Sequence, residues 1–227
     1  GVTCLLEVRL MPTKALNFSL YVITDPDLSG GRMHTEVAKL ALEGGANVIE
    51  FRDKRATVRR QYEVAKQLRE LTKQYNAYLI INDRPDIAMA VEADGVHLGP
   101  EDLPIEVVRK LVGDTMLIAA SAYDPQEALE AQEAGADFIV ARPLFRTRWA
   151  IDKGPSMGID GLRRLTQTVN IPVVPVGGIR VDNLKDVMST GVLCPGVTTA
   201  IVGADDPKSA AQEIRKLVDS LRVAASS

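Results

Sequence analysis

The stretch DPQEALEAQEAGADFIVA, residues 124–141, carries the pattern on which the fold assignment rests. Asp124 and Pro125 supply an N-cap and a first helical residue, and Glu127 stands three residues after the cap, where a carboxylate complements the helix dipole. Gly135 follows as a left-handed C-terminal cap. The apolar run that comes next, DFIVA, is too short for a helix. The stretch therefore predicts a helix that leads directly into a buried strand.

The same alternation of helix and strand recurs along the whole chain. EGGANVI at 43–49 repeats the pattern of EAGADFI at 133–139. Eight short apolar runs are predicted to be buried parallel strands: LYVIT (20–24), ANVIEF (46–51), AYLII (77–81), GVHL (95–98), MLIAA (116–120), DFIVA (137–141), PVVPVG (172–177) and GVTTAIV (196–202). Their spacing averages about 25 residues, the length of one βα unit. The pattern predicts an α/β fold, a single (β/α)8 TIM barrel, with an open doubly wound sheet as the alternative.

The predicted domain organisation is simple. Residues 1–18 form an N-terminal tail or extension, and residues 19–223 form one TIM-barrel catalytic domain. Asp206 and Pro207 repeat the helix-start signal, which predicts a last helix that runs to about Leu221. No Gly-x-Gly-x-x-Gly follows the first strand, which disfavours a dinucleotide-binding sheet.

Composition excludes several classes of partner. The net charge is −3 and aromatic residues make up 4% of the 227 residues, so neither a basic surface nor a stacking platform for nucleic acid is expected. The two cysteines form no Cys-x-x-Cys pair and are accompanied by only two histidines, so no structural zinc site is expected. No apolar run approaches about 18 residues, so no membrane partner is expected. We predict a cytoplasmic protein that binds small molecules, and leave a homo-oligomer open.

Polar residues that follow the predicted strands indicate where ligands bind. Active sites of such barrels lie at the C-terminal ends of the strands. Glu50, Arg52 and Lys54 follow the second run, and strand alternation places them on one side. If Glu50 points into the barrel, then Arg52 and Lys54 lie at its mouth. Two cations there suit a phosphate or a diphosphate.

Carboxylates and glycines complete the predicted rim. Asp83 and Asp102 follow adjacent strands, and carboxylates beside a polyphosphate commonly share Mg²⁺, the cofactor that we predict. Gly177 and Gly178 allow close approach of the backbone to a second phosphate. His97 alternates with apolar neighbours and is interpreted as a satisfied core or rim histidine rather than a base. The residues alone therefore predict a barrel that binds two phosphorylated groups, one of them with a metal.

The chain resembles the thiamine-phosphate synthase family over about residues 19–222. The motifs that carry the resemblance are LYVITD (20–25), EFRDK (50–54), INDRPDIA (81–88), ADGVHLGPEDLP (93–104), ASAYDPQEALEAQEAGADFI (120–139) and IPVVPVGGI (171–179). The resemblance implies Mg²⁺-dependent coupling of 4-amino-2-methyl-5-hydroxymethylpyrimidine diphosphate with 4-methyl-5-(2-phosphoethyl)thiazole, giving thiamine phosphate and pyrophosphate. It also implies that diphosphate leaves first and that the thiazole nitrogen then captures the pyrimidine methyl cation.

The resemblance assigns roles to individual residues. It implies that Arg52, Lys54 and Ser121 are catalytic, and that Asp83 and Asp102 bind Mg²⁺. The positions that it implies for substrate binding are Glu50, Arg52, Lys54, Asn82, Ser121, Thr147, Gly178 and Thr199. Arg52, Lys54 and Asn82 match residues that hold the diphosphate, whereas Gly178 and Thr199 match the thiazole-phosphate cradle.

Three parts of the chain depart from the family pattern. Near the eighth run, Val192, Leu193 and Cys194 stand where the family has Ala-Asp-Gly. Glu50 stands where the family usually has Gln at a position that contacts the pyrimidine. In the loop after the sixth run, Arg142 stands for Gly, Trp149 for Thr and Ala150 for a lysine that binds diphosphate. The cations considered as substitutes for that lysine are Arg146, Arg148 and Lys153.

Two other functions stay open from the sequence. One is a paralogue without synthase activity, similar to thiazole tautomerase; the catalytic histidine of that enzyme would fall at Tyr123, which argues against it. The other is a non-catalytic barrel that binds phosphorylated ligands and lost turnover with Ala150.

Overall fold

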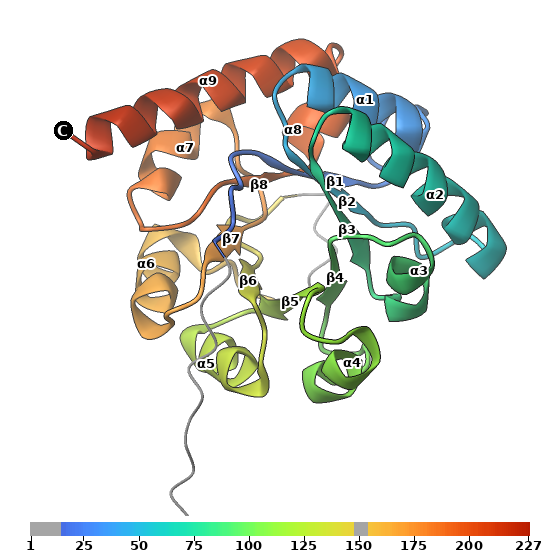
Figure 1. Cartoon of the computed structure of the whole chain (residues 1–227). Helices are drawn as coiled ribbons and strands as arrows, with labels where there is room; N and C mark the ends of the chain where they lie inside the picture. The colour runs from blue at the N-terminus through green and yellow to red at the C-terminus, as the bar shows by residue number, and fades with distance from the viewer. Residues whose placement is uncertain (1–14, 148–153) are drawn as a thin grey trace, which may run out of the picture.

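A computed structural model describes residues 15–147 and 154–227, in which strands and helices alternate around a central barrel (Figure 1). The strands are β1 (Tyr21–Thr24), β2 (Val48–Phe51), β3 (Tyr78–Asn82), β4 (Gly95–Leu98), β5 (Leu117–Ala122), β6 (Phe138–Ala141), β7 (Val173–Pro175) and β8 (Gly196–Val197). The helices are α1 (His34–Glu43), α2 (Val58–Gln74), α3 (Pro85–Ala90), α4 (Ile105–Val112), α5 (Pro125–Ala134), α6 (Gly158–Thr168), α7 (Val181–Met188), α8 (Thr199–Val202) and α9 (Pro207–Ala225).

All eight strands are parallel and pair with their neighbours in chain order, and β1 pairs with β8. A parallel bridge between Val176 and Gly196 joins the end of β7 to the start of β8. Gly196 permits this approach, because a Cβ there would lie 2.6 Å from Val176 Cγ2 and 2.9 Å from the Pro175 oxygen. The TIM barrel predicted from the sequence is therefore confirmed, and the open doubly wound sheet is excluded.

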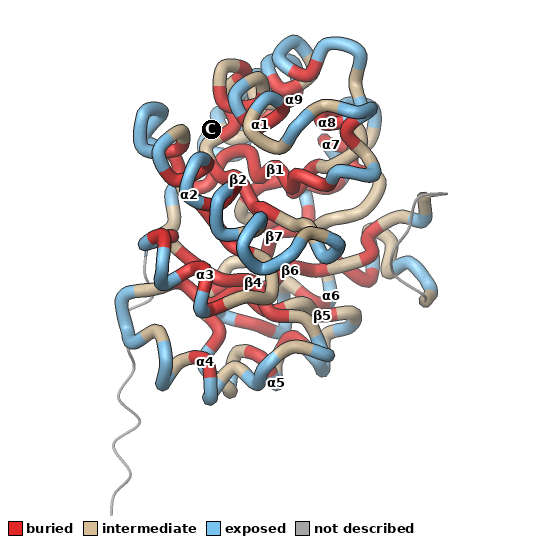
Figure 2. The backbone as a smooth tube through the Cα atoms, turned by 90° about the vertical axis from the view of Figure 1, so that its right-hand side faces the viewer, coloured by how far each residue is buried: buried red, intermediate tan, exposed pale blue. Residues whose placement is uncertain are grey.

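Alternation along the strands creates two apolar regions. Val48 belongs to the cluster inside the barrel, whereas Ile49 and Phe51 belong to the larger cluster between the barrel and its helices. In Figure 2 the strands are almost continuously buried, and exposed residues gather on the outer faces of the helices. Phe18 is 1% exposed and closes the barrel floor, with its ring centroid 5.3 Å from that of Phe138. Phe18 therefore packs in the core, although the predicted tail includes it. The domain boundary after residue 18 stays a prediction.

The eighth apolar run differs from its prediction as a strand over 196–202. Only Gly196 and Val197 are extended, and residues 199–202 form the short helix α8. Thr198 turns the chain with φ −119° and ψ −88°, and its carbonyl accepts the amides of Ile201 at 3.0 Å and Val202 at 2.8 Å. The turn brings Thr198 and Thr199 to the barrel mouth.

Helix caps follow the sequence signals. Asp124 accepts the amide of Glu127 at 2.8 Å, and Gly135 is left-handed with φ 105°. Asp206 caps α9 in the same way through Ser209, and the helix extends to Ala225, beyond the predicted end at Leu221. None of the helices in the described part of the chain has the length and apolarity needed to cross a membrane.

Candidate active site

A buried carboxylate lies below the barrel mouth. Glu50 on β2 points into the barrel and is 1% exposed. Its Oε1 accepts the Tyr21 hydroxyl at 2.5 Å and lies 2.9 Å from His97 Nδ1, while its Oε2 accepts the Asn82 amide at 3.4 Å. Burial raises the pKa of Glu50, but His97, Tyr21 and Arg142 outweigh it, so the pKa is lowered overall. Glu50 is therefore held ionised in the barrel interior.

His97 connects Glu50 to the mouth. Its Nε2 lies 2.8 Å from Ser121 Oγ at the end of β5, and the imidazole is 1% exposed. Both ring nitrogens thus have partners, which confirms the interpretation of His97 as a satisfied core histidine. Ser121 is half-buried and is the more accessible end of this chain of hydrogen bonds.

Arg52 lies at the mouth and is paired. Its Nη1 donates to Asp25 Oδ2 at 2.7 Å, and the Asp25 side chain is only 4% exposed. The amide of Asp27 also donates to Asp25, at 2.9 Å. Lys54, two residues beyond Arg52, is exposed. Asp25 is a site residue that sequence reasoning missed; its position directly after the first strand is the signal that could have identified it.

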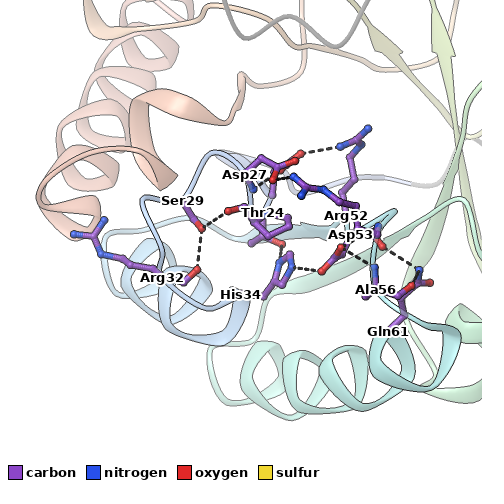
Figure 3. A network of polar contacts seen from close by, with 12 residues as sticks. Thr24, Asp27, Ser29, Arg32, His34, Arg52, Asp53, Ala56 and Gln61 are labelled. Carbon is purple, nitrogen blue, oxygen red and sulfur yellow. Dashed lines mark hydrogen bonds and ion pairs between the residues drawn. The ribbon is translucent and has the colours of Figure 1, made fainter.

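A polar network fixes the loop that carries Arg52 and Lys54 (Figure 3). His34 bridges Thr24 Oγ1 at 2.8 Å and Asp53 Oδ2 at 3.1 Å. The other oxygen of Asp53 accepts the amides of Arg55 and Ala56 in the same loop. The His34 side chain is 9% exposed, and burial lowers its pKa against the opposing effect of Asp53.

Asp83 and Asp102 meet beside Lys54. Burial, followed by the neighbouring Asp102 carboxyl group, raises the pKa of Asp83 to about 6, against the opposing effects of Lys54 and Arg84. Asp83 is held at φ 69°, and Asp102 Oδ2 accepts the Gly99 amide at 2.7 Å. Two crowded carboxylates gain from a shared cation, and hard oxygen ligands suit Mg²⁺. Among residues 15–147 and 154–227, no cluster of three or more His, Cys, Asp or Glu side chains offers a complete metal site, so phosphate and water oxygens would have to supply the other ligands.

A cavity beside Glu50 is lined by arginine, glycine and threonine residues together with apolar side chains. Its lining includes Arg52, Gly177, Gly178, Thr147 and Thr199. Gly177 and Gly178 have φ values of 125° and 69°, and a Cβ on Gly178 would lie 3.0 Å from Phe145 Cβ and 3.2 Å from Thr147 Cγ2. The structure thus brings together Thr147, Gly178 and Thr199, as their predicted roles require.

Arg142 lies in the same cavity. Its Nη2 donates to the Tyr123 hydroxyl at 3.3 Å, and its guanidinium lies 5.9 Å from the centre of that ring. Arg52 and Arg142 are the two cations among the described residues that line the cavity. Arg146 is exposed and donates to the Gly154 carbonyl at 3.4 Å. Arg148, Trp149, Ala150 and Lys153 lie outside the described residues.

Comparisons with known proteins agree with one another. Residues 20–201 match the family model described as thiamine monophosphate synthase. The thiamine-phosphate synthases of Chloroflexus aurantiacus and Pyrococcus furiosus are 44% and 45% identical over 203 and 202 residues, which cover 89% of this chain in each case and 94% and 95% of those proteins. A solved structure of thiamine phosphate pyrophosphorylase from Pyrococcus furiosus superimposes with a TM-score of 0.84 at 44% identity, covering 90% of this chain and 96% of that one.

Proposed function

The chain belongs to the thiamine monophosphate synthase family of transferases, and we propose that it joins an aminopyrimidine methyl diphosphate to a thiazole phosphate, giving thiamine phosphate and pyrophosphate. The observation that carries the proposal is that one barrel mouth gathers a carboxylate pair, arginines and a glycine-rich cradle. This arrangement suits two phosphorylated substrates that must meet.

Arg52 and Lys54 hold and stabilise the diphosphate in this proposal. When the bond between the pyrimidine methylene carbon and the diphosphate oxygen breaks, its electron pair leaves with the oxygen, and negative charge accumulates there. Cations fixed in advance stabilise this charge more in the transition state than in the ground state. The ion pair with Asp25 holds Arg52 in one orientation before the substrate arrives.

Asp83 and Asp102 are the residues that would hold Mg²⁺. Their proximity and the raised pKa of Asp83 support this assignment, because a bound cation would relieve the repulsion between the carboxylates. Mg²⁺ supplies charge neutralisation of the departing diphosphate when bound. Lys54 approaches Asp83 closely enough to oppose the rise in its pKa, so the metal and the lysine would face the same phosphate.

The cavity at Gly177 and Gly178 binds the thiazole phosphate in this proposal. Amides in left-handed turns form anion-binding concavities, and Thr147 and Thr199 add hydroxyl donors. Asn183 supports the turn by donating to the Gly178 carbonyl at 2.9 Å. The thiazole nitrogen would then attack the pyrimidine methylene carbon above Glu50 and Ser121, with no protein nucleophile.

Ala150 stands where the family has a lysine that binds diphosphate. We assign the missing positive charge to Arg142, at the start of the loop after β6. It lines the cavity, and its charge acts on Glu50. The exposed Arg146, in contrast, bonds to the loop backbone. Arg142 therefore replaces Arg146 as the described residue that we favour for this role.

The cellular setting is also a proposal. We propose a cytoplasmic enzyme, because its substrates are phosphorylated metabolites. Light scattering would measure its oligomeric state.

The test is turnover by the purified chain. We expect thiamine phosphate to form when both substrates and Mg²⁺ are present, and not when any one of the three is omitted. Binding of thiamine phosphate without turnover would instead support the non-catalytic barrel, and conversion of the thiazole alone would support the tautomerase-like paralogue.

A further inference from the structure

A chain of hydrogen bonds runs through the barrel interior and ends at the mouth. Tyr21 and His97 both contact Oε1 of Glu50, at 2.5 Å and 2.9 Å, and His97 Nε2 reaches Ser121 Oγ at 2.8 Å. Tyr21, Glu50 and His97 are at most 1% exposed, whereas Ser121 is half-buried. Ser121 is thus the most accessible member of this chain, while Glu50 borders the cavity beside Arg52.

The positions of the protons follow from the partners. Both Glu50 oxygens can only accept, since the carboxylate is ionised. The Tyr21 hydroxyl keeps its proton and donates, because burial and then Glu50 raise its pKa well above the usual range. His97 Nδ1 faces the same carboxylate oxygen, so Nδ1 carries a proton. In a neutral imidazole the other nitrogen is then an acceptor, and Ser121 is the described group that donates to it.

We propose that Glu50 and His97 are positioning residues that fix the Ser121 hydroxyl as a hydrogen-bond acceptor toward the ligand. The proton of Ser121 is committed to His97, so its lone pairs face the mouth. A fixed acceptor favours a ligand with an N–H donor at that point and disfavours one without it. The inference rests on the proposed function, because the aminopyrimidine substrate carries an exocyclic amine that can be this donor. Glu50 thereby contributes to substrate selection through His97 and Ser121.

The chain offers variants that separate this role from packing. His97→Asn keeps an N–H group directed toward Glu50 but has no atom in place of Nε2, so Ser121 is released. Ser121→Ala removes the acceptor itself. In both variants the Glu50 carboxylate retains the Tyr21 hydroxyl and the Asn82 amide as donors.

The first experiment reads the tautomer in the free protein. The chain has two histidines, so a long-range ¹H–¹⁵N correlation spectrum contains two imidazoles, and His34→Asn assigns them. We expect His97 to carry its proton on Nδ1 and to have an unprotonated Nε2. A proton on Nε2, in either the neutral or the doubly protonated imidazole, would overturn the proposal. This result does not depend on the substrate.

The second experiment measures selection. Calorimetry with Mg²⁺ compares the 4-aminopyrimidine methyl diphosphate with its 4-methyl analogue. We expect wild type to prefer the amine by about tenfold, and Ser121→Ala to lose most of that preference, since one hydrogen bond is removed. His97→Asn should reduce the preference to about twofold, with both variants checked by thermal unfolding. Retention of the full preference by folded His97→Asn would overturn the proposal, and Ser121→Ala carries the same test if His97→Asn does not fold. Failure of wild type to bind either diphosphate would instead contradict the proposed function, and the tautomer measurement would still decide the positioning role.

Discussion

The Arg52 guanidinium donates to the Asp25 carboxylate at 2.7 Å, and the two side chains are 16% and 4% exposed. Removal of one member of a buried pair leaves the other charge without compensation. The pair therefore links the stability of the barrel mouth to the cation that faces the diphosphate.

Arg52→Ala should lower both stability and the chemical step. We expect unfolding to become easier by about 3 kcal/mol, because Asp25 stays buried without its partner. We expect kcat to fall about 100-fold, as for loss of one donor to a developing oxyanion. Urea unfolding and steady-state kinetics measure the two effects.

The double variant Arg52→Ala/Asp25→Asn is the control. It should recover most of the stability but not kcat, since the buried charge is gone while the cation is still missing. A rise in KM alone for Arg52→Ala would place this residue in uniform substrate binding.

Asp83→Asn should stabilise the metal-free protein while it removes metal-dependent binding. The pKa of Asp83 is raised from 3.8 to about 6, so the folded state binds more protons than the unfolded state between these values, and stability falls as pH rises through that window. Solvent screening at this partly exposed site strongly reduces the free energy that corresponds to a shift of about two pKa units. We therefore expect Asp83→Asn to raise the free energy of unfolding by about 1 kcal/mol above pH 6 and not to change it below about pH 3.8. Asn also tolerates the left-handed backbone at this position.

Asp86→Asn should change stability in the opposite direction to Asp83→Asn. The hydrogen bond from Arg84, the largest of several effects, lowers the pKa of Asp86, so its contribution to stability is present above the unfolded pKa and is lost as pH falls. Thermal unfolding at pH 3.5, 5 and 7.5 separates the two variants. Equal effects of both variants on thermal unfolding at all three pH values would contradict the raised pKa of Asp83.

Gly178→Ala should weaken binding of the thiazole phosphate. The new Cβ would approach Phe145 and Thr147 to 3.0 Å and 3.2 Å, and φ 69° strains a residue with a side chain. Gly113→Ala is the matched control, with φ 76° and no atom within 4 Å of the added Cβ. Both variants should lose about 1 kcal/mol of stability, but only Gly178→Ala should raise the KM for the thiazole phosphate. Equal KM values would place the phosphate elsewhere.

Much of the fold could be predicted from the sequence because buried parallel strands are short, apolar and regularly spaced. Seven runs formed strands within a few residues of their predicted ends. The eighth formed a helix after Val197, because the carbonyl of Thr198 binds two following amides, a choice that depends on local dihedrals rather than on hydrophobicity.

The candidate site was predictable where residues directly follow strands. Arg52, Asp83 and Gly178 lie at the mouth for that reason. The pairings of Arg52 with Asp25 and of Glu50 with His97 were not predicted, since these contacts join strands that are separated in the sequence. Which inward-pointing side chains make contact depends on how the strands are arranged in the closed barrel, and the spacing of apolar runs contains no information on this arrangement.

Arg142→Met should reduce kcat/KM about tenfold or more, because it removes one of the two described cations in the cavity while retaining a long apolar side chain. Arg146→Met, four residues away on the exposed part of the loop, is the matched control and should change kcat/KM less than twofold. The reverse order would return the role to Arg146.

The most direct measurement of the proposed synthase activity is the stoichiometry of products in one time course. Wild type is mixed with the aminopyrimidine methyl diphosphate, the thiazole phosphate and Mg²⁺, and ³¹P NMR follows both products together. Coupling at the barrel mouth predicts one thiamine phosphate for each pyrophosphate released, over many turnovers per protein. Absence of both products, or pyrophosphate released without thiamine phosphate, would contradict it.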